Sequence, residues 1–164
     1  LLVMRHAKSD WSGSFRDDHD RALAPRGVKA ASLMGRFLAA SGYTPDLVVT
    51  STAVRARTTV ELAAAAGGWT CAIASTCDFY GAEPDVVLER LRGENGTPRI
   101  LVAGHEPTWS ALVAVATGGG RVRMPTAAVA CVEFAANSWS DIHAGSGQLS
   151  WLVTPKLLNG PLNQ

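Results

Sequence analysis

The sequence opens with Leu1-Leu2-Val3-Met4-Arg5-His6-Ala7, an apolar run that ends in two adjacent basic residues. Four consecutive apolar residues, one of them β-branched, favour a strand that is covered on both faces, as in a parallel sheet flanked by helices. In such sheets, the groups that carry function gather beyond the carboxyl ends of the strands. The opening stretch therefore predicts a buried strand that brings Arg5 and His6 to one edge of a sheet.

Two more predicted strands end at the same edge. Residues 46–50 form an apolar stretch followed by Ser51 and Arg55, and residues 99–104 form another, followed directly by His105. Ser51 either caps the next helix or bonds a ligand, and Arg55 falls in the first turn of that helix. We therefore expect one pocket to be lined by four side chains, namely Arg5, His6, Arg55 and His105.

Strands and helices alternate along most of the remaining chain. Turn signals and apolar spacing predict helices over residues 25–40, 53–66, 84–92 and 106–117. Further strands are predicted at 70–76 and, as an antiparallel hairpin before a tail of ten residues, at 128–134 and 149–154. This order predicts an α/β fold, a three-layer α/β/α sandwich with a mostly parallel central sheet. No linker or repeat divides the chain, so we expect a single domain over residues 1–164.

The charges of the chain are nearly balanced, with 15 Lys and Arg against 14 Asp and Glu. This balance argues against nucleic acid or an anionic membrane as partner, and no apolar run approaches the roughly 20 residues that span a bilayer. Cys71, Cys77 and Cys131 lack disulfide or metal spacing, so we expect buried free thiols and a cytoplasmic protein. The sequence begins without Met and inside a predicted strand, which leaves open whether N-terminal residues are missing.

The four predicted pocket residues suit an anion with several oxygen atoms. Guanidinium groups match phosphate oxygens two at a time, and the amino end of the helix that carries Arg55 adds backbone donors and a favourable dipole. A neutral imidazole can also attack phosphorus and hold the phosphoryl group as a covalent phosphohistidine. The residue types therefore predict phosphate chemistry, with one histidine as nucleophile and the other stabilising charge.

Four motifs extend this prediction to a known family. Val3–Trp11 (V-M-R-H-A-K-S-D-W), Asp18–Arg21 (D-H-D-R), Ser51–Thr58 (S-T-A-V-R-A-R-T) and Gly104–Pro107 (G-H-E-P) occur in this order. Together they closely resemble the histidine phosphatase superfamily, which has the phosphoglycerate mutase-like fold. Within it they look like the small branch typified by the phosphohistidine phosphatase SixA. The resemblance covers most of the chain, from the first strand to the hairpin.

The resemblance implies that His6 is the nucleophile and that Arg5, Arg55 and His105 bind the phosphoryl oxygens and stabilise the transition state. Water would then hydrolyse the phosphohistidine intermediate, and neither a cofactor nor a metal is implied. The expected substrate is a phosphohistidine-bearing protein. A small phosphomonoester is the alternative, and a phosphate-binding or interaction module without turnover is a second one.

Two departures from the family pattern bear on the substrate. The usual R-H-G of the superfamily is R-H-A here, where the small Ala7 still keeps the backbone close to phosphate. Many members also use a carboxylic acid to protonate an alcohol leaving group, and Glu83, in the loop 77–83, is the possible proton donor. Glu83 lies outside any matching motif and suits a solvated loop or helix-cap residue better than a proton donor. Weak acid machinery favours a P–N bond, because the leaving nitrogen is readily protonated.

Overall fold

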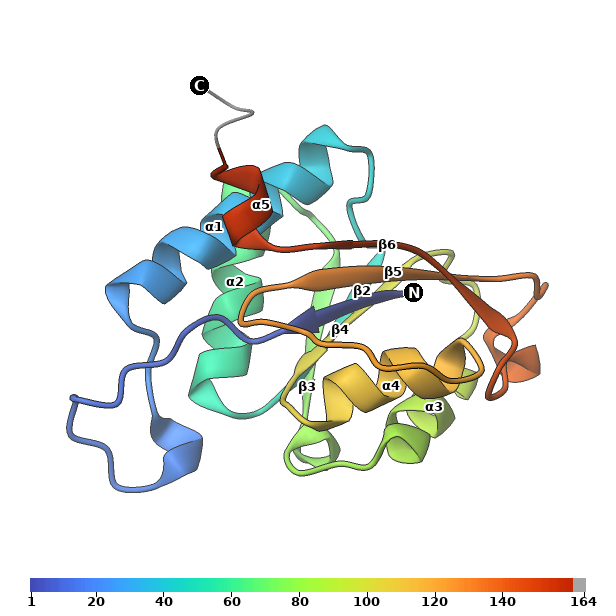
Figure 1. Cartoon of the computed structure of the whole chain (residues 1–164), viewed down its shortest axis with the longest axis horizontal. Helices are drawn as coiled ribbons and strands as arrows, with labels where there is room; N and C mark the ends of the chain where they lie inside the picture. Colours follow the sequence, from blue (N-terminus) through green and yellow to red (C-terminus); the bar gives the residue numbers. More distant parts are fainter. Residues whose placement is uncertain (161–164) are drawn as a thin grey trace.

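A six-stranded sheet runs through the centre of the computed structural model, which describes residues 1–160 (Figure 1). The strands lie in the order β3-β2-β4-β1-β5-β6. Their bounds are Leu2–Arg5 (β1), Leu47–Ser51 (β2), Ala72–Thr76 (β3), Ile100–Gly104 (β4), Val129–Phe134 (β5) and Gly147–Val153 (β6). β1 to β4 are mutually parallel, whereas β5 pairs antiparallel with β1 and β6 pairs antiparallel with β5. The predicted α/β class with a mostly parallel sheet is confirmed.

Helices cover both faces of this sheet. Their bounds are Pro25–Ala40 (α1), Val54–Gly67 (α2), Pro84–Arg92 (α3), Thr108–Ala116 (α4) and Pro155–Leu158 (α5), and three short 3-10 turns occur at Asp18–Asp20, Cys77–Phe79 and Trp139–Asp141. Leu2 and Met4 share one core cluster with the apolar residues of α1 and α2, whereas Val3 shares the other with those of α3 and α4. Side chains alternate across a strand, so β1 contributes to both cores. The three layers are visible in Figure 1.

The register of the parallel strands aligns the residues that follow them. Arg5 at the end of β1 lies opposite Gly104 at the end of β4, and the His6 amide donates to the Gly104 carbonyl oxygen (2.9 Å). β2 pairs with the other side of β4, with Thr50 opposite Ala103. The carboxyl ends of β1, β2 and β4 therefore meet at one edge of the sheet, as the sequence predicts.

The end of the chain differs from the predicted tail. Residues Pro155–Leu158 form α5, whose first turn is capped by Thr154, since the Thr154 hydroxyl oxygen accepts the Leu157 amide (3.3 Å). A capping hydroxyl followed by Pro at the first helical position is a helix start, so the prediction of a tail is wrong there. The remainder of the predicted tail, 161–164, lies outside the described residues.

One of the three cysteines also departs from its predicted environment. Cys131 is buried in β5 and Cys71 is partly buried, but Cys77 is exposed. Cys77 begins a 3-10 turn in the loop after β3. The prediction of a buried thiol is therefore wrong for Cys77.

We expect Gly35→Ala to destabilise the fold, because α1 and α2 pack backbone to backbone at this position. A Cβ atom at Gly35 would lie 2.0 Å from the Ala63 carbonyl oxygen. Relieving this overlap requires the helices to separate, at a typical cost of about 1–3 kcal/mol, and the higher helix propensity of Ala offsets only part of it. Urea unfolding measures the change, with Arg36→Ala at the neighbouring exposed position as control. An unchanged midpoint for Gly35→Ala would contradict the close packing.

Candidate active site

His6 lies directly beyond β1 and is only 8% exposed. Its Nδ1–H group donates to the carbonyl oxygen of Ala7 (2.7 Å), because a carbonyl can only accept. Burial, together with the smaller effects of the His105, Arg55 and Arg5 charges, lowers the pKa of His6 to about 3, although the Ala7 hydrogen bond acts in the opposite direction. His6 is therefore a neutral imidazole whose Nε2 atom carries a free lone pair.

His105 faces His6 from the end of β4. The two ring centroids are 5.1 Å apart, and the Nε2 atom of His105 lies 2.9 Å from the hydroxyl oxygen of Ser51. Burial, with a smaller contribution from the charge of Arg55, lowers the pKa of His105 to about 4. When Ser51 donates to Nε2, the His105 proton is on Nδ1, which is buried and has no hydrogen-bond partner. His105 then presents an unused donor.

Arg5 is held by a chain of contacts that starts at Glu106, just before α4. One carboxylate oxygen of Glu106 accepts the Ser110 hydroxyl (2.7 Å), and the same hydroxyl oxygen accepts the amide of Met124 (3.0 Å). The Met124 carbonyl oxygen in turn accepts Nη1–H of Arg5 (2.8 Å). The Glu106 carboxylate thus fixes the segment that orients Arg5, a role for which the sequence gives no signal beyond its place after His105.

Arg55 lies in the first turn of α2 and is 5% exposed. Its Nη1 atom donates to the carbonyl oxygen of Asp18 (2.6 Å), and its Nη2 atom donates to Oδ2 of the same residue (2.9 Å). Burial raises the pKa of the Asp18 carboxyl, but the hydrogen bond from Arg21, the charge of Arg55 and a hydrogen bond from Tyr80 lower it more. Asp18 is therefore an ionised partner of Arg55.

Unsatisfied donors concentrate at these residues. Among the described residues, four buried side-chain nitrogen atoms have no hydrogen-bond partner: Arg5 Nε, Arg55 Nε, His105 Nδ1 and Trp69 Nε1. Three of the four belong to the predicted pocket. A buried donor left unpaired typically costs about 1–3 kcal/mol, so this arrangement fits a ligand that supplies several acceptor oxygens.

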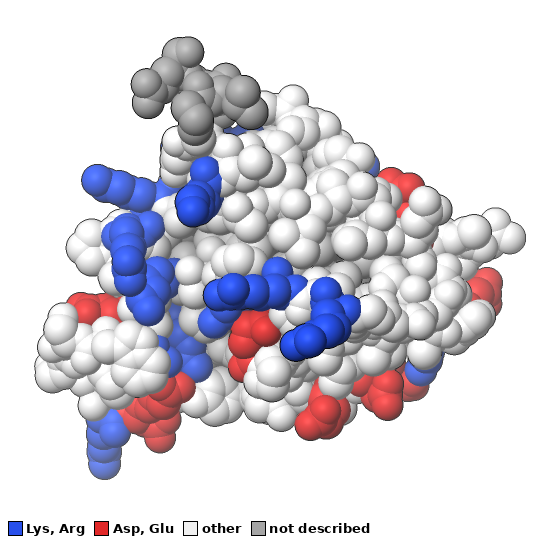
Figure 2. Space-filling model, in the orientation of Figure 1, with Lys and Arg blue, Asp and Glu red and all other residues white. Residues whose placement is uncertain are grey.

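The surroundings of the site are basic. Arg26 in the first turn of α1 and Arg123 beside Met124 are exposed, and Lys8 is partly exposed two residues after His6. Figure 2 shows Lys and Arg side chains gathered on the side toward which β1 points, while Asp and Glu lie mainly along the lower edge. Although the net charge is only +1, the local field therefore favours the approach of an anion.

Glu83 does not join the four pocket residues. It is exposed at the N-cap of α3, where its side chain makes no capping hydrogen bond, and it has no hydrogen bond to any of the four. Its loop nevertheless reaches the site through Tyr80, whose ring centroid lies 5.4 Å from that of His105 and whose hydroxyl donates to Asp18 (3.1 Å). Asp18 and Tyr80 are thus contacts of the site that the sequence leaves unassigned.

His19 contacts Thr52 and Tyr80. Its Nε2 atom lies 3.0 Å from the hydroxyl oxygen of Thr52, and its ring packs against Tyr80. No group of three or more His, Cys, Asp or Glu side chains within residues 1–160 is arranged to hold a metal ion. No helix within residues 1–160 has the length and apolar character that crossing a membrane requires.

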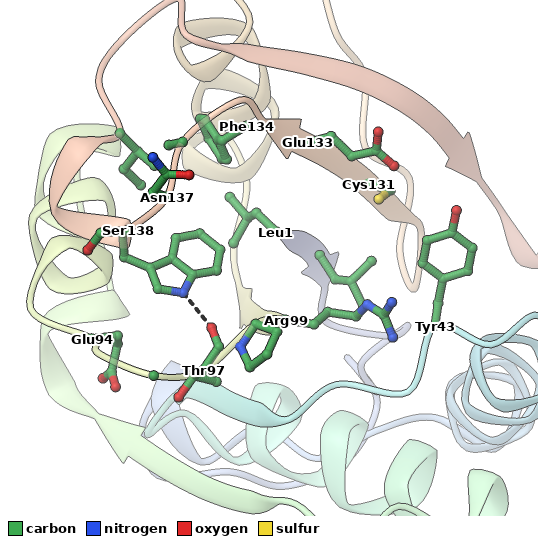
Figure 3. A pocket seen from close by; sticks show the side chains of 16 residues that line it. Leu1, Tyr43, Glu94, Thr97, Arg99, Cys131, Glu133, Phe134, Asn137 and Ser138 are labelled. Atoms are coloured by element: carbon green, nitrogen blue, oxygen red, sulfur yellow. Dashed lines mark hydrogen bonds between the residues drawn. The ribbon is translucent and has the colours of Figure 1, made fainter.

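A cavity of about 570 Å³ occupies the opposite edge of the sheet. Figure 3 shows Leu1, Arg99 and Glu133 around this space. Trp139 also lines the cavity, and its Nε1–H donates to the Thr97 carbonyl oxygen (2.6 Å). Leu1 and Arg99 precede β1 and β4, whereas His6 and His105 follow these strands. The cavity is therefore separate from the candidate site.

Comparisons with known proteins agree with this geometry. Residues 1–76 match the profile of the histidine phosphatase superfamily (branch 1). An uncharacterized protein of Mycobacterium tuberculosis strain H37Rv, Rv1276c, is 38% identical over 165 residues, covering 93% of this chain and 100% of that protein.

Two solved structures share the fold. The protein histidine phosphatase SixA complexed with tungstate superimposes with a TM-score of 0.84 at 23% identity, covering 96% of this chain and 97% of that one. A mycobacterial glucosyl-3-phosphoglycerate phosphatase superimposes with a TM-score of 0.66 at 16% identity, covering 92% and 97%. The profile match, the full-length relative and the shared fold show that this chain belongs to branch 1 of the histidine phosphatase superfamily and is a phosphatase.

Proposed function

We propose that this phosphatase removes the phosphoryl group from phosphohistidine on a protein, through a covalent intermediate on His6. The observation that carries the proposal is the neutral His6, whose Nδ1–H is held by Ala7 and whose Nε2 is free. Unpaired donors on Arg5, Arg55 and His105 surround it with the groups that phosphoryl oxygens require.

In the first step, the lone pair of His6 Nε2 attacks phosphorus. A P–N bond to His6 forms while the P–N bond to the substrate imidazole breaks, and the departing nitrogen keeps the electron pair of that bond. Charge spreads over the three equatorial oxygens in the transition state, where the guanidinium groups of Arg5 and Arg55 and the Nδ1–H of His105 stabilise it. The Ala7 carbonyl holds the proton on His6 Nδ1 and so keeps Nε2 as the attacking atom.

In the second step, water attacks the phosphorus of phosphorylated His6. The new P–O bond forms as the P–N bond to Nε2 breaks, and both protons of the water leave with the inorganic phosphate. His6 returns to its neutral form with Nδ1–H still bonded to Ala7. The low pKa of His6 supports this cycle, because the free enzyme does not lose its nucleophile to protonation at neutral pH.

The environment of the carboxylates supports a P–N substrate. Asp18 is bound by two arginines with a lowered pKa, Glu106 is bound by Ser110, and Glu83 is exposed without a contact to the four site residues. A substrate imidazole that carries a proton on its second nitrogen departs as a neutral group without an acid. An alkoxide needs a proton in the transition state, which none of these carboxylates is placed to supply.

A small phosphomonoester is the second candidate substrate. The observation in its favour is that Glu83 follows the loop that carries Tyr80 to the edge of the site. The two candidates differ in their need for an acid, so a comparison of substrates separates them. A module that binds phosphate without turnover is distinguished by vanadate, which mimics the five-coordinate state and inhibits a working phosphatase.

We expect the wild-type protein to prefer a phosphohistidine substrate over an aryl phosphate, and Glu83→Ala to change neither rate by more than a small factor. Glu89→Ala, at another exposed glutamate of α3, is the matched control. Steady-state kcat/KM on both substrates is the measurement. A preference for the ester, together with a loss of about 100-fold in Glu83→Ala, would identify Glu83 as the general acid and favour the small phosphomonoester.

We expect His6→Ala to lose covalent labelling by a radioactive phosphodonor while the protein remains folded. The side chain lies beyond the end of β1 and outside both core clusters, so its removal leaves the sheet intact. His143→Ala, at an exposed histidine far along the chain, should label like the wild type. Labelling that persists in His6→Ala would place the nucleophile on another residue.

We expect the buried histidines to stay neutral where free histidine titrates. The pKa of His6 is lowered to about 3 and that of His105 to about 4, while both regain about 6.5 on unfolding. Between these values the unfolded state binds protons that the folded state does not, so stability falls as pH drops from about 6.5. At about pH 5 the loss is roughly 2 kcal/mol for each histidine.

NMR titration of the imidazole C–H signals tests this expectation directly. In the folded protein the His6 and His105 signals should not shift between about pH 5 and 8, whereas in urea they should titrate near about 6.5. Urea unfolding over the same pH range measures the matching loss of stability. A midpoint near neutrality for His6 in the folded protein would mean that its lone pair is not freely available for attack.

A further inference from the structure

Asp18 joins three separate segments of the chain beside the candidate site. Its Oδ1 atom accepts Nε–H and Nη2–H of Arg21 (3.0 and 2.8 Å), and its Oδ2 atom accepts Nη2–H of Arg55 (2.9 Å) and the hydroxyl of Tyr80 (3.1 Å). Arg21 belongs to the loop after β1, Arg55 to α2 and Tyr80 to the loop after β3. One carboxylate therefore connects all three.

Asp18 accepts hydrogen bonds from both terminal nitrogen atoms of the Arg55 guanidinium. The backbone carbonyl oxygen of Asp18 takes Nη1–H (2.6 Å) and its carboxylate takes Nη2–H, which leaves Nε–H buried and unpaired. A guanidinium fixed along one edge cannot rotate, so its remaining donors are already oriented for an oxyanion. Orientation achieved before the substrate binds lowers the entropic part of the barrier.

Asp18 is itself fixed by the packing of Arg21. The Arg21 guanidinium is buried and donates through Nη1 to the Ser9 hydroxyl oxygen, and its Cζ atom stacks over the Trp11 ring, 3.6 Å from the ring centroid. Stacking and hydrogen bonding hold this guanidinium in one place, so its two hydrogen bonds to Asp18 Oδ1 hold the carboxylate as well. The carboxylate is thus a rigid support and not a mobile surface group, although its side chain is 44% exposed.

We propose that Asp18 is a positioning residue that orients the Arg55 guanidinium for the transition state of phosphoryl transfer. This inference rests on the proposed function, because it assumes that Arg55 stabilises the phosphoryl oxygens. Asp18 does not contact the reacting atoms in this role and acts only through Arg55. The Tyr80 hydroxyl adds a third donor to the carboxylate and aligns a ring that also packs against His105.

The isosteric change Asp18→Asn is the sharpest perturbation of this support. An amide has one acceptor oxygen, so whichever way it is placed, either Arg21 or Arg55 faces an N–H group in place of an oxygen. One guanidinium must then move. Asp20→Asn is the matched control, because Asp20 lies in the same 3-10 turn, is exposed and has no contact with Arg55.

A double-mutant cycle tests whether Asp18 acts through Arg55. We expect Asp18→Asn and Arg55→Ala each to lower kcat by about 100-fold with little change in KM, and the double variant to resemble Arg55→Ala alone. Asp20→Asn should retain wild-type rates. In arginine side-chain NMR spectra, the Nε–H signal of Arg55 should broaden in Asp18→Asn while the backbone amide signals remain, a change that general destabilisation would not produce.

Any one of three results would overturn the inference. These are a kcat of the double variant lowered by the product of the two single losses, a loss of kcat in Asp20→Asn as large as that in Asp18→Asn, and an unchanged Arg55 Nε–H signal in Asp18→Asn. The cycle is run on the phosphohistidine substrate. If only the aryl phosphate is hydrolysed, the proposed function fails and the same cycle on that ester decides the role of Asp18. If neither substrate is hydrolysed, the cycle is run on the vanadate affinities of the wild type, the two single variants and the double variant. Additive losses of vanadate binding free energy in the double variant would then reject the role of Asp18.

Discussion

Burial of two imidazoles beside two guanidinium groups is the constraint on which the site depends. His6 and His105 are each 8% exposed, and burial, with the charge of Arg55, lowers the pKa of both. A third or fourth positive charge in this volume is therefore excluded at neutral pH, and the histidines remain neutral. The same burial leaves donors of the arginines without partners. An anion with several oxygen atoms adds no positive charge and also supplies acceptors for the unpaired arginine donors.

The fold creates this crowding through strand register and close helix packing. β1 and β4 run in parallel with Arg5 opposite Gly104, so His6 and His105 leave the sheet side by side. A Cβ atom at Gly104 would lie 2.4 Å from the Trp109 ring, so glycine lets α4 pack against the strand end directly before His105. Backbone geometry thus sets the distance between the two imidazoles before any side-chain contact is made.

How far the sequence predicts the site depends on whether a residue follows a regular element. Arg5, His6 and His105 were predictable because apolar strands end at or directly before them, and Arg55 because it falls in a first helical turn. The contacts of Asp18 with Arg55 and Tyr80 were not predictable, since a long loop without periodicity carries no signal for its path. Cys77 is exposed and α5 forms because short turns begin at Cys77 and at Pro155. Local capping residues determine where such turns begin, and the pattern of apolar residues does not show it.

The support of Arg55 also bears on the choice of leaving group. A carboxylate that accepts hydrogen bonds from two arginines and a tyrosine is stabilised in its ionised form, so Asp18 cannot deliver a proton at neutral pH. The Asp18 carboxylate, which is hydrogen-bonded to Arg55, thus orients this arginine and does not act as an acid. The Glu106 carboxylate likewise accepts the Ser110 hydroxyl, so the proton for the leaving group must come from the substrate or from solvent. A leaving group that already carries its proton, such as the imidazole of phosphohistidine, is the one that such a site can release fastest.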